Sequence, residues 1–182
     1  MTVQDLTEEE LMRKISRNDA EAFHELLARY ERRVFSSAWR LCFNQTEAED
    51  LTQETFIRIW HNAGTWKPEA KLDTWIYRIL HNLFIDSRRR LKAETEELSE
   101  DIRSNEDTPE QSLIKKRTAQ EVANALNELP DRQKEAVVLC YYQEMKAKEA
   151  AEVLSVSQSA LETLLFRARQ TLKIKLGRKK GA

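Results

Sequence analysis

The chain has 182 residues, of which 34% are charged, and its 30 Lys and Arg residues nearly balance its 31 Asp and Glu residues. No apolar run reaches the roughly 20 residues that span a bilayer, and the acidic N-terminus is unlike a signal peptide, so we expect a cytoplasmic protein with no membrane insertion. The 3 glycines are too few for the glycine-rich loops that hold nucleotide phosphates, which disfavours nucleotide-dependent chemistry.

The charge is divided unevenly along the chain. Residues 1–91 hold 14 basic and 15 acidic side chains, residues 92–112 hold 2 and 8, and residues 113–182 hold 14 and 8. The corresponding net charges are −1, −6 and +6. The basic C-terminal part indicates an anionic partner for that end of the molecule.

Scarce Gly and Pro together with abundant Ala, Leu, Glu, Lys and Arg favour an all-α chain. The first predicted helix runs from Asp19, a suitable N-cap, to Leu41. Spacings of three and four give it one apolar face, formed by Ala22, Phe23, Leu26, Leu27, Tyr30, Val34 and Ala38.

A second helix is predicted from about Thr46 to His61, with Thr46 and Glu49 as a capping box and Gly64 beyond its end. One face of this helix carries a mainly acidic stripe, formed by Glu47, Asp50, Gln53, Glu54 and Ile57. Such a stripe is either a solvated surface or a contact for a protein partner that carries Arg.

A third helix is predicted to continue to Arg90, capped by Asp73 or Thr74, with a buried stripe formed by Leu72, Ile76, Ile79, Leu80 and Leu83. Another face carries Arg78, Asn82, Asp86 and Arg89, close to Trp66, Trp75, Tyr77 and the cluster Arg88 to Arg90. Aromatic rings, an amide and arginines are the groups that hold unstacked single-stranded bases. Aromatic residues packed in the core and arginines at a helix C-terminus are the alternative interpretation.

Residues 92–112 contain eight acids and few large aliphatic residues, so we expect a flexible linker between two domains. Helices are predicted over 113–126, 131–143 and 146–154, and a last one extends from the turn at Ser155 to Ser157 to about Leu176. Ala150 and Ala151 permit close packing of the last two helices, which match a helix-turn-helix with Ser157 as the cap of the second.

Neither a metal site nor a cofactor is expected. Cys42 and Cys140 are far apart and should be buried apolar residues. The three histidines, His24, His61 and His81, have no metal-binding spacing, so a helical hydrolase or nuclease is disfavoured and we expect no enzyme.

Three segments together resemble one protein family. They are Asp50–Trp60 (DLTQETFIRIW), Thr74–Asn82 (TWIYRILHN) with Asp86 and Arg89 beyond it, and the stretch from Leu129, Pro130 and Arg132 to Phe166–Arg169 (FRAR). Over about residues 10–176 their order and spacing are similar to those of bacterial extracytoplasmic-function (ECF) sigma factors of the sigma-70 family. The resemblance implies a sigma two domain over 1–91, a linker over 92–112 and a sigma four helix-turn-helix domain over 113–182.

The resemblance also implies a function and a set of partners. Such a protein binds core RNA polymerase through the β′ coiled coil and the β flap, directs it to promoter DNA without ATP, and is often controlled by an anti-sigma factor. The residues implied in polymerase binding are Glu47, Asp50, Gln53, Glu54 and Ile57. Those implied at the minus-ten element are Trp66, Lys71, Trp75, Arg78, Asn82, Arg88, Arg89 and Arg90, with Asn82 holding a flipped base and 66–73 as the specificity loop.

At the minus-thirty-five element the implied residues are Lys146, Lys148, Ser157, Gln158, Ser159, Thr163 and Arg167. The chain departs from the family pattern here, because Leu161, Glu162 and Leu164 stand where many members have a valine followed by arginines. Glu162 repels phosphate, and Leu164 is expected to pack inside, so the usual minus-thirty-five sequence does not follow.

Two further hypotheses come from the sequence. A helix-turn-helix regulator that binds duplex DNA without polymerase is the main alternative function. For a sigma factor, the linker would permit the two domains to close on each other, hiding the acidic stripe and the DNA-reading helix, and its acids could discourage DNA binding in the free protein.

Overall fold

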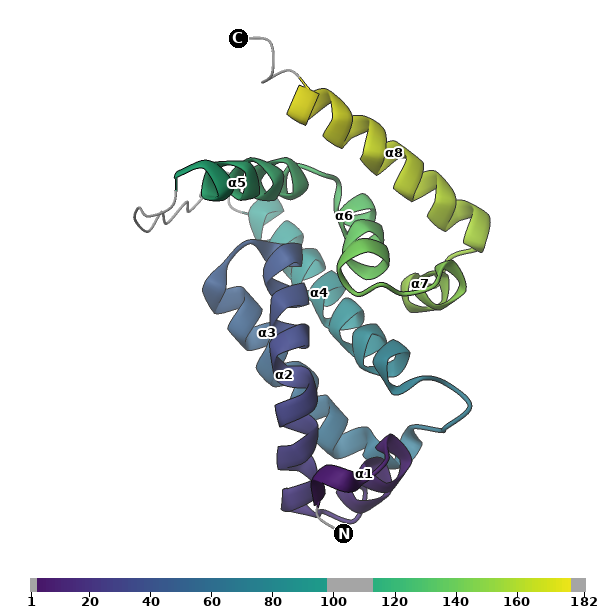
Figure 1. Cartoon of the computed structure of the whole chain (residues 1–182). Coiled ribbons are helices and arrows are strands. Elements are labelled where there is room, and N and C mark those ends of the chain that lie inside the picture. The colour runs from purple at the N-terminus through teal and green to yellow at the C-terminus, as the bar shows by residue number, and fades with distance from the viewer. Residues whose placement is uncertain (1–2, 98–112, 178–182) are drawn as a thin grey trace.

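The computed structural model describes residues 3–97 and 113–177, with no side chains described for 94–97 and 113–119. Every regular element in these two ranges is helical (Figure 1), which confirms the all-α prediction. The elements are a 3₁₀ turn Val3–Asp5, α1 Glu8–Ile15, α2 Ala20–Cys42, α3 Gln45–Asn62, a 3₁₀ turn Ala63–Thr65, α4 Leu72–Glu97, α5 Leu113–Asn127, α6 Asp131–Val137, a π-helical segment Val138–Tyr142, α7 Ala147–Leu154 and α8 Gln158–Gly177.

Helix α1 was not predicted, although its start is encoded locally. Thr7 and Glu10 form a capping box, in which Glu10 N donates to Thr7 Oγ1 at 3.2 Å and Thr7 N donates to Glu10 Oε2 at 2.8 Å. The hydrogen bond from Thr7 N to the Glu10 carboxylate lowers the pKa of Glu10. The apolar residues that follow, Leu11, Met12 and Ile15, are buried in the first domain.

The predicted N-cap of α2 is confirmed, and the predicted N-cap of α3 is wrong. Ala22 N donates to Asp19 Oδ1 at 3.0 Å, as predicted. Helix α3 begins earlier than predicted, because Asn44 Oδ1 accepts from Glu47 N at 2.9 Å and Asn44 is the N-cap. Phe43 ends α2 with φ of 51°, so α3 starts immediately and Thr46 lies inside it.

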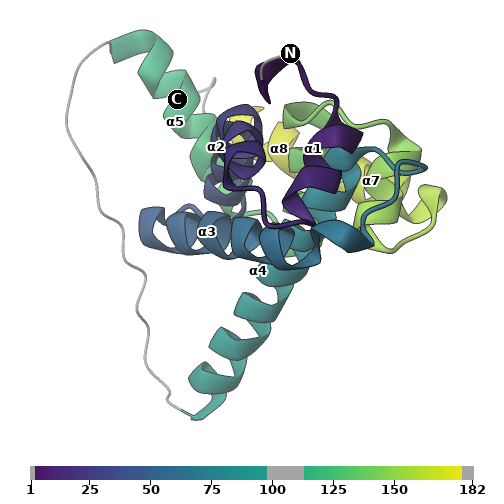
Figure 2. The same ribbon diagram turned by 90° about the horizontal axis from the view of Figure 1, so that it is seen from below.

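Helix α4 is longer than predicted and continues past Arg90 to Glu97. Figure 2 shows its C-terminal end projecting away from α2 and α3. The first six residues of the expected linker are therefore helical, while the rest of it, 98–112, lies outside the described residues. No cap by Asp73 or Thr74 is seen, since Leu72 starts the helix, Asp73 pairs with Arg33 at 3.2 Å and Thr74 is buried.

The C-terminal domain contains the predicted helix-turn-helix. Ser155 adopts a left-handed conformation with φ of 53° and ends α7, and Ala160 N donates to Ser157 Oγ at 3.2 Å, which confirms Ser157 as the cap of α8. The helix predicted over 131–143 instead changes from α to π geometry at Val138. Close packing at Ala150 and Ala151, both buried, brings α7 against α8.

The two domains pack directly against each other. Helix α7 contacts α4, and α2 contacts α5, α6 and the π-helical segment (Figure 1). The buried side chains of both domains form one continuous core cluster. The chain is therefore closed, although neither Asp50 on α3 nor the N-terminal part of α8 is covered.

Candidate partner and nucleic-acid interfaces

The predicted stripe on α3 divides into outward and inward residues. Asp50 and Gln53 are exposed, and Ile57 is 43% exposed, which is high for a large aliphatic side chain. Glu54 is half-buried and pairs with Arg58 at 3.1 Å. Glu47 is turned toward α4, so four of the five stripe residues remain on the outer surface.

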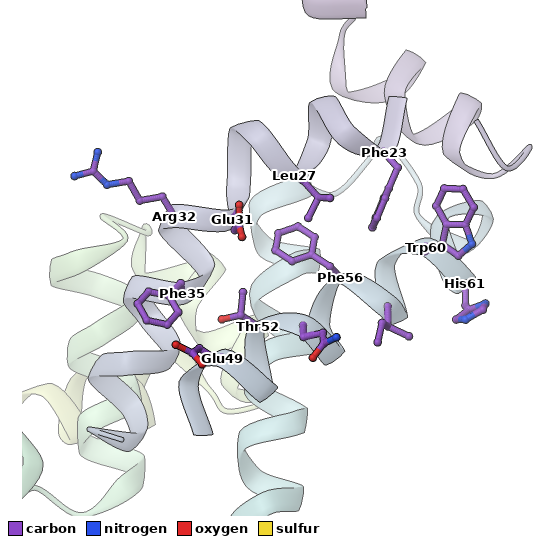
Figure 3. A pocket seen from close by; sticks show the side chains of 12 residues that line it. Phe23, Leu27, Glu31, Arg32, Phe35, Glu49, Thr52, Phe56, Trp60 and His61 are labelled. Carbon is purple, nitrogen blue, oxygen red and sulfur yellow. The ribbon is translucent and has the colours of Figure 1, made fainter. Parts of the chain in front are cut away.

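Beside this stripe lies an apolar hollow of about 730 Å³ between α2 and α3 (Figure 3). Its aromatic lining is ordered by edge-to-face contacts, because the Phe23 ring lies 6.4 Å from Phe56 and 5.0 Å from Trp60 between centroids. Glu31 and Glu49 stand at its rim with Arg32 and His61. The remaining lining residues are Leu27, Phe35, Thr52, Gln53 and Ile57.

The helical spacing predicts a buried face for Phe23 and Leu27 and gives no indication of the hollow. The sequence signal for the hollow is Phe35, a large apolar residue that does not fit the three- and four-residue spacing of the buried face of α2. In the structure Phe23, Leu27 and Phe35 are half-buried, whereas Leu26 and Val34 on the neighbouring face are fully buried. Helix α2 therefore presents two apolar faces, and only one of them belongs to the core.

Glu47 connects the start of α3 to the arginine cluster of α4. Its Oε1 accepts from Ser87 Oγ at 3.2 Å, and its Oε2 lies 3.7 Å from Arg88 Nη2. The Arg88 guanidinium also lies 5.0 Å above the Phe84 ring. A residue expected to bind polymerase and one expected to bind DNA are thus paired with each other.

Helix α4 exposes one polar face along its length. Arg78, Asn82, Arg89 and Arg90 are all exposed, as is Asp86 between them. Spacings of four and three place Arg78, Asn82, Asp86 and Arg89 on one side of the helix. This arrangement can offer an amide to a base and guanidinium groups to phosphates.

The aromatic residues near α4 are mostly packed. Tyr77 is 1% exposed and burial raises its pKa to about 12, so it belongs to the core. Trp66 and Trp75 are half-buried against the core cluster. Trp66 Nε1 is buried without a hydrogen-bond partner among the described residues, which leaves a donor at the start of the 66–73 loop. Lys71 from the same loop pairs with Glu149 of α7 at 2.7 Å.

All residues predicted to read the minus-thirty-five element are exposed on α7, α8 and the turn between them: Lys146, Lys148, Ser157, Gln158, Ser159, Thr163 and Arg167. The first turn of α8 is fixed locally, since Ser157 Oγ lies 3.1 Å from Ser159 Oγ and Thr163 Oγ1 donates to Ser159 O at 2.9 Å. This helix end carries short polar side chains followed by Arg167, which suits a major groove.

The unusual residues of α8 take different positions. Leu161 is fully buried, Leu164 is half-buried against the core, and Glu162 is exposed beside the reading residues. Phe166 is 59% exposed and Ile174, two turns later, is 55% exposed. Helix α8 therefore has an apolar surface in addition to its polar reading end.

The remaining expectations concern cysteines, metals and membranes. Cys42 is buried and Cys140 is half-buried, and burial raises the pKa of the Cys42 thiol to about 11. Within residues 3–97 and 113–177 the structure holds no group of three or more His, Cys, Asp or Glu side chains placed to bind a metal ion. In the same ranges we find no helix with the length and apolarity needed to cross a bilayer.

Comparison with known proteins relates both domains to one family. Residues 26–94 match the family model for sigma-70 region 2, and residues 119–172 match the model for sigma-70 region 4. The ECF RNA polymerase sigma factor SigE of Mycolicibacterium smegmatis is 35% identical over 84% of this chain, which spans only 60% of that relative. SigM of Bacillus subtilis, also an ECF sigma factor, is 35% identical over 69% of this chain and 77% of its own length.

A solved structure has the same fold. The sigma factor RpoE of Bartonella quintana, crystallised in complex with the anti-sigma factor NepR, superposes with a TM-score of 0.75 at 26% sequence identity. The superposition covers 85% of this chain and 96% of RpoE. The closed arrangement of the two domains is therefore similar to that of a chain bound to an anti-sigma factor.

Proposed function

The chain belongs to the ECF family of RNA polymerase sigma factors, and from this premise we propose that it joins core polymerase, directs it to promoters and is restrained by an anti-sigma factor. Catalysis belongs to the polymerase, and this chain supplies contacts only. Its place of action is the cytoplasm, where bacterial polymerase and the chromosome are found. The proposal is supported by an apolar hollow between α2 and α3 that occurs together with exposed polar faces on α4 and α8.

The hollow between α2 and α3 is the docking site for polymerase. A concave apolar surface of this size is uncommon on a chain that acts alone, and an amphipathic helix that lays its apolar face into such a groove would fill it. Asp50 and Glu49 on α3 and Glu31 on α2 supply negative charge around it. The occupant is therefore a basic amphipathic helix, as the β′ coiled coil is in the sigma factor family.

The second polymerase contact falls on α8. Phe166 and Ile174 are the most exposed large apolar side chains of the described residues. They lie eight residues apart along α8, and both come after its polar first turn. An apolar docking surface there fits the β flap and leaves Ser157, Gln158 and Ser159 free for DNA.

Promoter reading is divided between the two domains. On α4, Asn82 holds a flipped base of the minus-ten element, while Arg78, Arg89 and Arg90 neutralise the nearby phosphates. Extrusion of a base costs a few kcal/mol of stacking, and a site that rewards only the right base converts this cost into selectivity. Glu47 acts by holding Arg88 and the C-terminal half of α4 in place.

The proposal is tested by gel filtration with core polymerase. Ile57→Arg places a charge in the rim of the hollow, where the side chain is 43% exposed, so the fold should persist and polymerase binding should weaken at least tenfold. Gln4→Arg, which adds the same positive charge at an exposed site outside the hollow, is the matched control. Equal binding by both variants would exclude the hollow as the docking site.

The alternative function, a regulator that binds duplex DNA without polymerase, is favoured only by the exposure of the α8 reading end. It predicts tight, sequence-specific binding to duplex DNA by the purified chain. A sigma factor predicts weak binding until polymerase is added. Electrophoretic mobility shifts on promoter fragments, with and without core enzyme, separate the two functions.

A further inference from the structure

The 66–73 loop connects the 3₁₀ turn Ala63–Thr65 to the start of α4, at the end of the first domain where α1 packs (Figure 1). The family resemblance assigns base selection in the minus-ten element to this loop. Residues 67–71 are exposed, and within them Ala70 N donates to Lys67 O at 3.2 Å. The orientation of so short and exposed a segment depends on the scaffold that holds its two ends.

The first end of the loop is held by packing against α1. The turn Ala63–Thr65 contacts α1, and Ala63 is buried. Gly64 lies close to Ser16 at the end of α1, because a Cβ added to Gly64 would meet the Ser16 Cβ at 3.6 Å. Trp66 follows and is half-buried against the core cluster. The point where the loop begins is therefore fixed by contacts with α1 and the core.

The second end of the loop is held by an ion pair with α2. Arg33 Nη1 donates to Asp73 Oδ1 at 3.3 Å, and Arg33 Nη2 donates to Asp73 Oδ2 at 3.2 Å. Two parallel contacts of this kind fix the orientation of the carboxylate as well as its distance. Asp73 directly follows Leu72, which is fully buried. Packing therefore fixes the position of this end, and the ion pair adds its direction.

Arg33 is itself placed by its neighbours on α1 and α2. Its guanidinium lies 5.9 Å from the centroid of the Tyr30 ring, one turn earlier on α2. The hydroxyl of Tyr30, a residue that is 4% exposed, donates to Glu8 Oε1 at 2.6 Å. Burial raises the pKa of Tyr30, so the hydroxyl keeps its proton and remains the donor. Glu8, Tyr30, Arg33 and Asp73 therefore connect α1, α2 and α4, and we call them the loop anchor.

The ion pair of the loop anchor contributes more to geometry than to stability. The side chains of Arg33 and Asp73 are 45% and 34% exposed, and ion pairs this accessible to water stabilise a fold only slightly. A recognition group, by contrast, has to be held to within about 0.5 Å of its working position. Loss of the pair is therefore expected to leave the first domain folded and to disturb the loop.

We propose that Arg33 is a positioning residue for promoter selectivity: through Asp73 it sets the orientation of the 66–73 loop, and with it the base that the loop prefers in the minus-ten element. This inference rests on the proposed function, in which the first domain reads that element. Arg33 does not touch DNA in this scheme, because its guanidinium is turned to Asp73 and Tyr30. It differs in this respect from Arg78, which is proposed to neutralise phosphates.

Hydrogen exchange of the free chain tests the loop anchor without polymerase. Arg33→Gln and Asp73→Asn each remove the ion pair, so amide exchange in a peptide covering residues 66–75 should become about two- to fivefold faster. Arg33→Gln added to Asp73→Asn should cause no further increase, because the two residues act as one pair. Arg33→Lys keeps the positive charge and should retain most of the protection.

Lys14→Gln is the matched control. Lys14 and Asp19 form an ion pair at 3.0 Å in the same domain, and their side chains are 45% and 30% exposed, much like the pair of the loop anchor. Exchange of the loop should remain at the wild-type rate in this variant, and circular dichroism confirms that every variant is folded. Wild-type exchange in Arg33→Gln, equal acceleration by Lys14→Gln, or additive effects of Arg33→Gln and Asp73→Asn would each overturn the proposal.

Selectivity is measured with the polymerase complex on a promoter that the wild-type complex selects from random DNA fragments. Rates of open-complex formation are compared for this promoter and for single-base substitutions in its minus-ten element. Arg33→Gln should lower the preference for the selected base about tenfold, with core polymerase binding unchanged, and Arg33→Lys should restore most of the preference. An unchanged preference, or an equal loss of rate on every sequence, would overturn the positioning role.

The two measurements separate this inference from the function on which it rests. Failure of the wild-type chain to bind core polymerase would refute the proposed function. Hydrogen exchange of the free chain would still decide whether Arg33 orients the 66–73 loop. Normal polymerase binding together with an unchanged base preference in Arg33→Gln would overturn the further inference alone.

Discussion

Helices α4 and α8 both carry a face that we propose reads DNA, but they relate to the rest of the molecule in different ways. The first turn of α8 is built locally. Ser157 Oγ pairs with Ser159 Oγ and accepts from Ala160 N, and Thr163 Oγ1 donates to the carbonyl oxygen of Ser159. Helix α4 has its reading face on one side, whereas Tyr77, Leu80 and His81 on the other side enter the contact with the second domain. If α4 reads DNA as proposed, its reading should therefore be coupled to domain closure.

The difference predicts where substitutions will act. A change among the exposed polar residues in the first two turns of α8 should alter DNA binding and little else. A change on the inner face of α4 should alter the first domain, the closed arrangement and the reading of DNA together. The following predictions test this contrast, from the largest effect to the smallest.

Leu80→Ala and Leu161→Ala give the largest expected effects. Both side chains are 1% exposed or less, so each truncation should lower the free energy of unfolding by about 2–5 kcal/mol. Leu161→Ala should act on the second domain alone. In the molecules that remain folded, it should leave intact a carbodiimide cross-link between Lys71 and Glu149, which lie 2.7 Å apart across the domain contact. Leu80 lines a void of about 10 Å³ where the two domains meet, so Leu80→Ala enlarges this void and should reduce that link. Calorimetry and cross-linking measure the two effects, and identical yields of the link in both variants would contradict the contrast.

Tyr77→Phe removes one donor from the interface and nothing from the reading face. The Gln143 Oε1 that accepts from Tyr77 would remain half-buried without that partner, which costs about 1–3 kcal/mol. We expect the closed fraction to fall while the first domain keeps its thermal stability to within a few degrees. Thr163→Val, which removes a hydroxyl from the exposed side of α8, should leave the closed fraction unchanged.

Most of the fold followed from helical spacing, and the errors have identifiable causes. Residues Leu72 to Leu83 and the turn after Leu154 were placed correctly because apolar periodicity and a Ser cap are local signals. The start of α3 was wrong because Asn44 competes with Thr46 as a cap and becomes available only when Phe43 ends α2 in a left-handed conformation. Helix α1 was missed even though Thr7 and Glu10 are spaced as a capping box.

The sequence predicted correctly which residues of the candidate interfaces are exposed on their helices. Asp50, Gln53, Asn82 and the α8 residues are exposed as the helical pattern required. The hollow beside α3 was not predictable. Phe23 and Phe35 lie on a second apolar face of α2, and the sequence does not distinguish an apolar face that lines a hollow from one that is buried in the core. The pairing of Glu47 with Arg88, and of His81 with Glu135, needs the tertiary fold, since 40 or more residues separate the partners.

A pH dependence of closure should come from Lys134. Burial in the interface lowers its pKa from the ordinary value of 10.5, so the closed form binds fewer protons than the open form in which the ammonium meets water. Closure should therefore become more favourable as the pH rises from the lowered pKa toward 10.5. Small-angle scattering between pH 8 and 10 should show the radius of gyration decreasing.

Lys134→Met supplies the reference for this measurement, because it cannot release a proton on closing. Burial raises the pKa of the nearby Cys42 thiol to about 11, which opposes the lysine, so both proteins retain Cys42 and only their difference is interpreted. Parallel curves for the two proteins would show that the Lys134 ammonium meets equal surroundings in the closed and open forms, and that Lys134 does not make closure depend on pH.

The smallest structural effect is expected for Glu162→Gln on the outer face of α8. Glu162 is exposed, so the free energy of unfolding and the closed fraction should not change. Loss of a negative charge next to phosphate should nevertheless strengthen binding of the polymerase complex to promoter DNA and steepen its dependence on salt.

Selection of bound DNA sequences decides how Glu162 acts. If Glu162 accepts a hydrogen bond from a cytosine amino group, one base preference disappears in the variant. If Glu162 only repels phosphate, affinity rises equally for all sequences. An unchanged affinity at low salt would place Glu162 away from DNA and move the reading surface of α8 toward Gln158 and Ser159.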